Sequence, residues 1–307
     1  MNSEAIGAES VTAGPTRTLA LIVNPAAGGG RAGRLLGAVG DALSAQGLEH
    51  HVERTTSLEH ARELARAAAE AGEVAVAFGG DGLIGAVAGA LADSEGVLGL
   101  LPGGRGNDLA RVLGIPLDPV AACQVLAGGV VKQLDLGQAG GKVFVGIASC
   151  GFDSEANRIA NETRIVRGNL VYAYGAIRAL IRWRPARFEL TLDDGRTHVV
   201  TGYSVGAANS KAYGGGMYAA PGAELDDGLL DIITCADMPK RRFLTSMLPK
   251  VFKGTHVGEP EVTVLRAAAV TIAADRPFTM YADGDPIAEL PVTVKALPGA
   301  VRAIVPR

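Results

Sequence analysis

Three short glycine-rich segments carry residue types that could bind a polyphosphate. They are NPAAGGGRAGR at Asn24 to Arg34, GGDG at Gly79 to Gly82, and PGGRGND at Pro102 to Asp108. Glycine has no side chain to keep a phosphate away from backbone N–H groups, and a helix that follows presents unpaired N–H donors. The residues we expect to contact the phosphates are Asn24, Pro25, Gly28, Gly29, Arg31, Gly79, Gly80, Asp81, Gly82, Gly104, Arg105, Gly106 and Asn107.

Two of these loops also carry a carboxylate. Asp81 and Asp108 would repel a phosphate unless a divalent cation or a bound nucleotide hydroxyl intervenes. Two carboxylates at two converging turns suggest Mg²⁺ held partly through water. The alternative is structural, because Asp and Gly are favoured in tight turns and Asn107 or Asp108 could be the N-cap of the next helix. Three such loops after successive strands weigh against that alternative.

Two other phosphate-binding motifs account for the loops less well. Gly28, Gly30 and Gly33 satisfy G-x-G-x-x-G, with Glu53 about 20 residues further on, as in dinucleotide-binding proteins. That pattern is weak by itself and leaves the other two loops unexplained. The sequence contains no G-x-x-x-x-G-K-[ST], which excludes a P-loop enzyme.

The elements around the loops predict a parallel α/β domain. From Arg17, short apolar runs such as TLALIV, VAVAF and VLGLL alternate with longer helical stretches. Their continuous apolar character indicates strands covered on both faces. Because ligands bind beyond the carboxyl ends of such strands, we expect the three loops to converge on one crevice.

The pattern changes after about residue 135. Alternating or β-branched runs separated by Gly, Pro and Asp predict a mainly antiparallel, β-rich unit, with helices near 169–182 and 239–251. We therefore expect a disordered tail at 1–16, an α/β domain at 17–136 and a β-rich domain at 137–307.

Composition restricts the partners and the compartment. A net charge of −3 and an apolar content of 48% fit a soluble globular protein and give no general attraction to nucleic acid. Three widely spaced cysteines predict a reducing, cytoplasmic setting. The polar N-terminal stretch lacks the apolar core of a signal peptide, and no run of about 18 apolar residues follows. A homodimer is the default expectation.

Six motifs, in order, resemble the bacterial diacylglycerol kinase and sphingosine kinase-like family of lipid kinases. They are NPAAGG, GGDG, PGGRGND, CGFDSEA at 150–156, PGAELDDGLLD at 221–231 and YADGD at 281–285. The resemblance implies a three-layer α/β domain of the NAD kinase and diacylglycerol kinase type that binds ATP, and a C-terminal β-rich sandwich domain that shapes a lipid site. It implies transfer of the γ-phosphate to the hydroxyl of diacylglycerol or a related long-chain alcohol.

The resemblance also assigns roles. It implies that Asp81, Asp108 and Asp135 take part with Asn107 in a Mg²⁺-linked network, and that Asp283 is the general base, with Asp285 where glutamate is usual. A carboxylate within reach of the hydroxyl can accept its proton, while transfer otherwise needs alignment and charge neutralisation. Without the resemblance, Asp283 and the glycine after it read as a type I′ hairpin turn.

Other positions leave alternatives open. The resemblance implies a structural Mg²⁺ bound by the carbonyls of Glu224 and Leu229 and the carboxylate of Asp227; the alternative is a solvated acidic turn. Leu83 replaces the family's usual threonine, and Arg105 lies in a loop whose usual Pro-Leu-Gly-Thr run has changed. Arg105 could bind phosphate oxygens through its forked donors.

The segment PKRRFLTSMLPKVFKG at 239–254 mixes cations with apolar residues at helical spacing. It could contact an anionic membrane, or pack its apolar stripe onto the second domain. We therefore expect a cytoplasmic protein at the inner face of the membrane. Two other functions stay open, an NAD kinase-like phosphotransferase and a lipid- or nucleotide-binding protein with weakened transfer.

Overall fold

The computed structural model describes residues 18–163 and 170–307, so the tail expected at 1–16 lies outside the described residues. The chain divides into two units. The first contains the residues up to Asp135 together with Gly299–Arg307, and the second contains Leu136–Pro298. The last residues of the chain, Gly299–Arg307, thus belong to the first unit.

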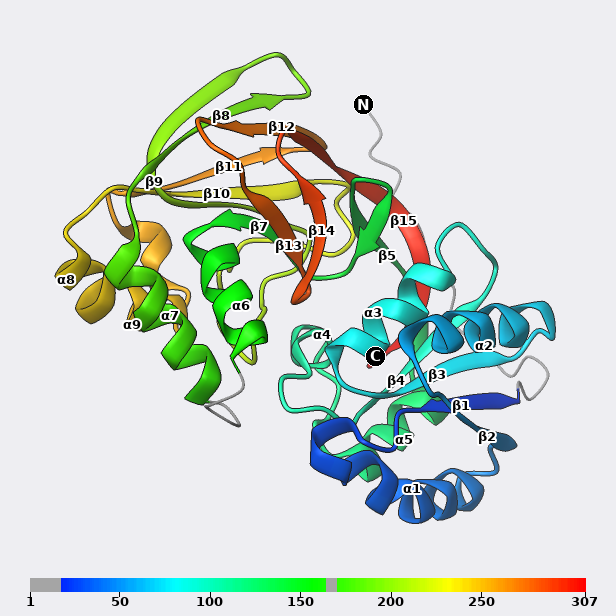
Figure 1. Ribbon diagram of the computed structural model, residues 1–307. Helices are drawn as coiled ribbons and strands as arrows, with labels where there is room; N and C mark the ends of the chain where they lie inside the picture. The colour runs from blue at the N-terminus through cyan, green and yellow to red at the C-terminus, as the bar shows by residue number, and fades with distance from the viewer. Residues whose placement is uncertain (1–17, 164–169) are drawn as a thin grey trace. The chain divides into compact units, whose positions relative to one another are not determined.

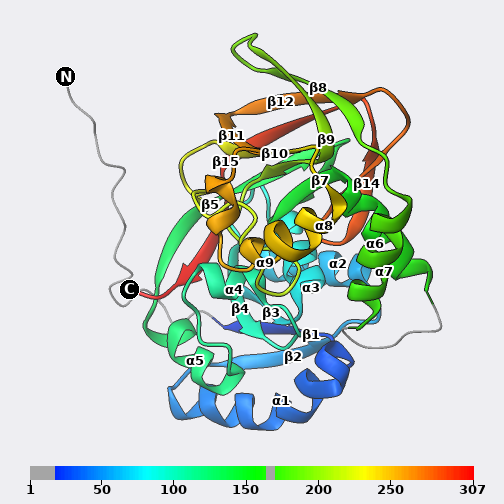
Figure 2. The ribbon, with the colours of Figure 1, turned by 90° about the vertical axis from the view of Figure 1, so that its left-hand side faces the viewer.

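The first unit is a parallel sheet between two layers of helices. Its strands run in the order β2 (His50–Arg54), β1 (Leu19–Val23), β3 (Val74–Gly79), β4 (Val97–Pro102), followed by the end of β15 (Val292–Val305). Helices α1 (Ala27–Ala45) and α5 (Pro119–Gly128) cover one face, and α2 (Leu58–Glu70) and α3 (Asp81–Ala90) cover the other (Figures 1 and 2). Every residue of β1, β3 and β4 is buried, which explains their continuous apolar sequence.

The register of this sheet brings the three glycine loops to one edge. Val23 pairs with Phe78, and Phe78 pairs with Leu101, so β1, β3 and β4 end side by side. The first loop follows β1, the second joins β3 to α3, and the third joins β4 to the short helix α4 (Asp108–Val112). The expected convergence of the loops is therefore present within this unit.

The second unit is β-rich and mainly antiparallel. Its strands are β6 (Lys142–Phe144), β7 (Ile147–Gly151), β8 (Ala186–Leu192), β9 (Thr197–Ala208), β10 (Leu230–Ala236), β11 (Val262–Ala267), β12 (Ala269–Ala274), β13 (Thr279–Ala282) and β14 (Asp285–Glu289). Strand β5 (Val130–Ala139) leads the chain into this unit, and β15 leads it out. In β8, buried and exposed residues alternate, because one face packs on the apolar core and the other faces solvent.

Helices close one side of this unit around an aromatic cluster. They are α6 (Phe152–Glu162), α7 (Leu170–Arg182) and a helical run made of α8 (Lys240–Arg242), the π-helical η1 (Phe243–Met247) and α9 (Leu248–Val251). A short 3₁₀ segment, η2 (Thr255–Gly258), follows. The rings of Tyr203 and Phe243 stack with centroids 4.2 Å apart, and Phe152 meets Phe243 edge to face at 4.9 Å. Sequence periodicity predicted α7 and the 240–251 run but not α6.

Candidate functional site

The three glycine loops of the first unit touch one another through their backbones. A Cβ on Gly104 would lie 2.4 Å from the Cα of Gly80, and a Cβ on Gly28 would lie 2.4 Å from the carbonyl oxygen of Gly103. The N–H of Gly103 donates to the carbonyl of Gly79 at 2.8 Å. Only glycine fits at these contacts, so these glycines bring three stretches of backbone together at one edge of the sheet.

The first glycine loop overlaps the start of α1, but its three consecutive glycines do not have helical backbone angles. Gly28, Gly29 and Gly30 have φ values of 60°, 69° and 86°, in the left-handed region, so regular helix begins after them. Upstream, the side chain of Asn24 accepts a hydrogen bond from the N–H of Ala26 at 3.0 Å and fixes the turn. The result is a tight, side-chain-free bend directly after β1.

Asp81 joins the second loop to the third. Its Oδ2 accepts a hydrogen bond from the N–H of Asn107 at 2.8 Å, and its Oδ1 accepts one from the N–H of Asp108 at 2.6 Å. Asp81 is the first residue of α3, but its carboxylate makes no helix cap. Asp81 therefore does not cap its own helix, and its carboxylate fixes the turn that precedes α4.

Asn107 shapes the third loop from within. Its φ of 55° is left-handed, its Oδ1 accepts a hydrogen bond from the N–H of Gly104 at 2.9 Å, and its Nδ2 donates to the Gly104 carbonyl at 3.1 Å. Asn107 occupies the N-cap position of α4 without capping it through its side chain. It therefore closes the loop around Gly104 and leaves the exposed Arg105 at the tip.

The other acidic positions predicted in this unit are buried. Asp108 is 7% exposed beside Asp81, and Asp135 is 2% exposed with its Oδ1 accepting a hydrogen bond from the N–H of Gly299 at 2.7 Å. Asp135 thus binds the C-terminal part of β15. Leu83, which replaces the usual threonine, is 3% exposed and packs beneath Gly79 instead of facing the loop surface.

In the second unit, Asp283 lies in the hairpin between β13 and β14. Asp283 and Gly284 have φ values of 51° and 95°, and Ala282 pairs with Asp285, as expected for a two-residue turn with two positive φ angles. The hairpin reading is therefore correct, and the exposed Asp285 begins β14. The Asp283 carboxylate also makes contacts outside this turn.

Two backbone donors hold the Asp283 carboxylate. Val145 N–H donates to its Oδ2 at 2.8 Å, and Gly146 N–H donates to its Oδ1 at 2.9 Å. A Cβ on Gly146 would lie 2.5 Å from that Oδ1, so glycine is required there for the carboxylate to approach. The segment before β7 thereby fixes the position and direction of the Asp283 side chain.

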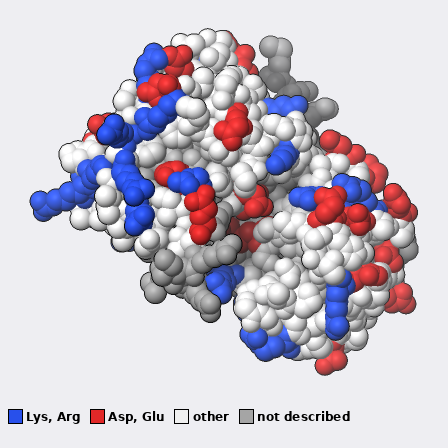
Figure 3. Space-filling model, viewed as in Figure 1, with Lys and Arg blue, Asp and Glu red and all other residues white. Residues whose placement is uncertain are grey.

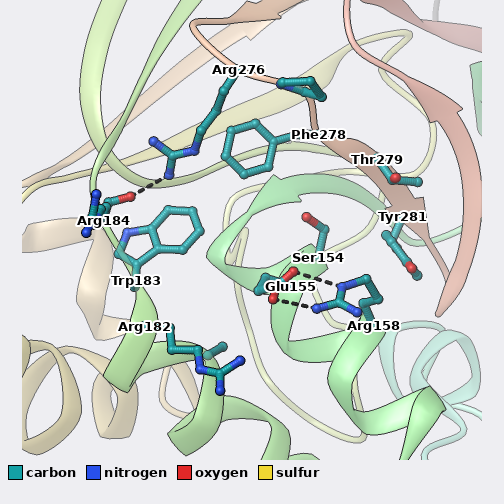
Figure 4. A pocket seen from close by; sticks show the side chains of 12 residues that line it. Ser154, Glu155, Arg158, Arg182, Trp183, Arg184, Arg276, Phe278, Thr279 and Tyr281 are labelled. Atoms are coloured by element: carbon teal, nitrogen blue, oxygen red, sulfur yellow. Dashed lines mark hydrogen bonds and ion pairs between the residues drawn. The ribbon is translucent and has the colours of Figure 1, made fainter.

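A cavity of about 580 Å³ lies beside the same hairpin (Figure 4). Aromatic residues form part of its wall, with Arg276 over the rings of Trp183 and Phe278 at 5.4 Å and 5.0 Å from their centroids. Tyr281, on β13, also lines it, and burial is the main cause that raises the pKa of its phenol. The sequence reading missed this cavity, whose lining residues are Ser154, Glu155, Arg158, Ala179, Arg182, Trp183, Arg184, Arg276, Pro277, Phe278, Thr279 and Tyr281.

The acidic turn at 224–231 does not fit a structural magnesium ion in this structure. The Oδ1 of Asp227 accepts a hydrogen bond from the N–H of Leu229 at 3.0 Å, and its Oδ2 pairs with the guanidinium of Arg266. Arg266 also pairs with Asp231 at 3.0 Å. A metal ion bound by Glu224, Asp227 and Leu229 would have to displace the Arg266 guanidinium. In this structure the turn is therefore held by an arginine, and it is neither a metal site nor a loop that only water contacts.

Comparisons with known proteins cover both units. The chain matches the diacylglycerol kinase catalytic domain over residues 18–139 and the YegS C-terminal NAD kinase beta sandwich-like domain over residues 146–305. It is 36% identical over 251 residues to a diacylglycerol kinase of Mycobacterium tuberculosis, covering 80% of each chain. It is 32% identical to a probable YegS-like lipid kinase of Pseudomonas fluorescens, covering 87% of this chain and 89% of the relative.

Solved structures share the fold. A putative diacylglycerol kinase from Bacillus anthracis superimposes with a TM-score of 0.78 at 24% identity, covering 94% of this chain and 97% of the other. The fold expected from the sequence, an α/β catalytic domain and a β-rich domain, is confirmed. The two domain matches and the identity to named kinases agree with the six ordered motifs, and the chain belongs to the diacylglycerol kinase and YegS-like family of lipid kinases.

Proposed function

We propose that this lipid kinase uses ATP and Mg²⁺ to phosphorylate the hydroxyl of diacylglycerol or a related long-chain alcohol. The observation that supports ATP is the junction of three glycine loops at the end of β1, β3 and β4, the second and third of which are joined by Asp81. Such a surface of backbone N–H donors suits a polyphosphate. Arg105, exposed at the tip of the third loop, adds a forked cationic donor for the phosphate oxygens.

The acidic residues of the first unit suit a Mg²⁺ ion that keeps several water ligands better than one whose ligands all come from the protein. The Asp81 carboxylate accepts a hydrogen bond from the backbone N–H of Asp108, but the described residues contain no group of three His, Cys, Asp or Glu side chains placed to hold a metal. Mg²⁺ retains waters and is often bound by one or two carboxylates together with substrate phosphates. When bound, it would neutralise charge on the transferring phosphate. Asp81, Asp108 and Asp135 are the residues we assign to it.

The second unit supplies the acceptor side of the reaction in this proposal. Asp283 accepts the proton of the lipid hydroxyl, in a direction fixed by the amides of Val145 and Gly146. Thr279 and Tyr281 line the aromatic cavity and belong to β13, the strand that ends directly before Asp283. One hairpin therefore carries both the proposed base and a wall suited to a lipid, with Asp285 at its other strand.

The direct test is transfer of label from γ-labelled ATP to dioctanoylglycerol, with NAD as a competing acceptor. We expect labelled phosphatidic acid that requires Mg²⁺. Label in NAD would indicate an NAD kinase-like activity, and ATP binding without transfer would indicate a binding protein. Because the substrate resides in a bilayer, we also propose peripheral contact with the inner face of the membrane, and a homodimer that sedimentation velocity can test.

A further inference from the structure

The outer side of α7 is an exposed surface of apolar and cationic residues. Ile177 and Ile181 are 51% and 69% exposed, one helical turn apart, and the exposed Arg178 and Arg182 repeat the same spacing beside them. The inner side of the helix, including Ala179 and Leu180, packs into the aromatic cluster. Because the inner stripe satisfies the packing of α7, the core does not account for the two exposed isoleucines.

The neighbouring helical run extends this surface. Lys240 of α8 donates through Nζ to the carbonyl of Ile181 at 2.9 Å, which places α8 at the end of α7. Leu244 follows one turn after Lys240 and is 43% exposed, and Arg241 is exposed beside it. In Figure 3, Lys and Arg side chains gather among uncharged atoms on the part of the second unit where Figure 1 places α7 and α8.

The run at 240–251 has two sides with different partners. Phe243 and Met247 are 6% and 3% exposed and belong to the aromatic cluster, so the expectation that the apolar stripe packs on the second unit is correct for them. Arg242 and Lys250 form ion pairs with acidic residues near β11, including Glu259. These two cations are neutralised, whereas Lys240 and Arg241, at the start of the run, form no ion pair with an acid among the described residues.

We infer that the outer surface of α7 and α8, formed by Ile177, Arg178, Ile181, Arg182, Lys240, Arg241 and Leu244, binds an anionic phospholipid bilayer. A helix that presents apolar side chains flanked by Arg and Lys is suited to lie at the interface of a membrane. Each cation near an anionic surface strengthens binding roughly fivefold. Among the described residues, Arg178, Arg182 and Arg241 form no ion pair with an acid, so their charge is available to headgroups.

The position of the cavity gives this surface a role in the proposed function, on which the inference rests. Ala179, on the inner side of α7, and Trp183, directly after the helix, line the aromatic cavity proposed for the lipid. Arg182, at the end of the outer surface, also reaches this cavity. One helix therefore has the bilayer on its outer side and the acceptor cavity on its inner side. A lipid that leaves the bilayer at α7 has only the width of this helix to cross.

The test is sedimentation of the full chain with vesicles of phosphatidylcholine alone or mixed with phosphatidylglycerol. We expect the unmodified chain to bind the mixed vesicles. The double variant Ile177→Gln/Ile181→Gln should bind them at least about tenfold more weakly, and binding by Arg178→Gln/Arg182→Gln should depend less on salt concentration. Val199, which is as exposed as Ile177 but lies on β9, supplies the matched control Val199→Gln, which retains binding.

Activity separates this inference from the kinase proposal. The isoleucine variant should phosphorylate a short-chain, monomeric diacylglycerol as the unmodified chain does, while losing activity on vesicle-borne lipid. The inference is wrong if the isoleucine variant binds vesicles as strongly as the unmodified chain. It is also wrong if the unmodified chain is a dimer and the variant is a monomer that binds vesicles equally well, because the surface would then be a dimer interface. Vesicle binding by a chain that phosphorylates neither acceptor would instead defeat the kinase proposal alone.

Discussion

Replacing Asp283 with asparagine separates the chemical role of its carboxylate from its role in the hairpin. Asparagine tolerates the left-handed φ of 51° at this position, so the turn should persist. Its side chain has one acceptor oxygen where the carboxylate has two, so either the Val145 or the Gly146 amide loses its partner. Loss of a hydrogen bond to a charged group costs about 1.5–3 kcal/mol.

Two measurements follow from Asp283→Asn. Hydrogen exchange at the 145–146 amides should accelerate about tenfold to a hundredfold, because each 1.4 kcal/mol corresponds to a factor of about ten. The kcat for label transfer from ATP to diacylglycerol should fall at least about a hundredfold, the lower range for general base catalysis. Asp93→Asn is the matched control, since Asp93 is an exposed non-glycine residue with a φ of 57° in the first unit; it should retain full activity.

The outcomes are distinct. Activity of Asp283→Asn within tenfold of the unmodified chain would refute Asp283 as the base, even if the amides exchange faster, and would leave the carboxylate a purely structural role. Unchanged exchange at the 145–146 amides would refute the anchoring geometry.

Three further changes test other parts of the structure. Gly146→Ala places a Cβ 2.5 Å from the Asp283 carboxylate and should lower kcat as Asp283→Asn does. Gly206→Ala on β9 is the control, because its Cβ would have its nearest neighbour at 3.6 Å and should leave kcat unchanged. Equal kcat values for the two alanine variants would contradict the contact. Gly104→Ala separates the second and third glycine loops and should weaken ATP binding by calorimetry at least about tenfold, while Gly37→Ala, in open space on α1, serves as control. Burial raises the pKa of Asp153 to about 6 from 3.8, so the folded state loses stability relative to Asp153→Asn as pH rises from 4 to 6. Because Asp153 is partly exposed, the gap in unfolding free energy should grow by at most about 3 kcal/mol, and a gap that is flat with pH would contradict the shift.

Sequence alone predicted the features that depend on local pattern. The buried strands β1, β3 and β4 appear as apolar runs because both of their faces are covered, and their shared direction brings the three glycine loops to one edge. The antiparallel second unit follows from its alternating strands, and α7 from its helical period. The sequence analysis did not predict helix α6, although Phe152, Ala156 and Ile159 recur there at helical spacing.

Tertiary structure alone decided what each carboxylate contacts. Asp81 holds amides more than twenty residues away, and Asp283 holds amides 137 and 138 residues earlier in the chain. Arg266, on another strand, neutralises the Asp227 predicted to bind a metal. Residue type and spacing report whether a segment is buried and how it turns, because those properties act over a few residues. The partner of a charge depends on strand order and register across the whole unit, and no local pattern encodes it.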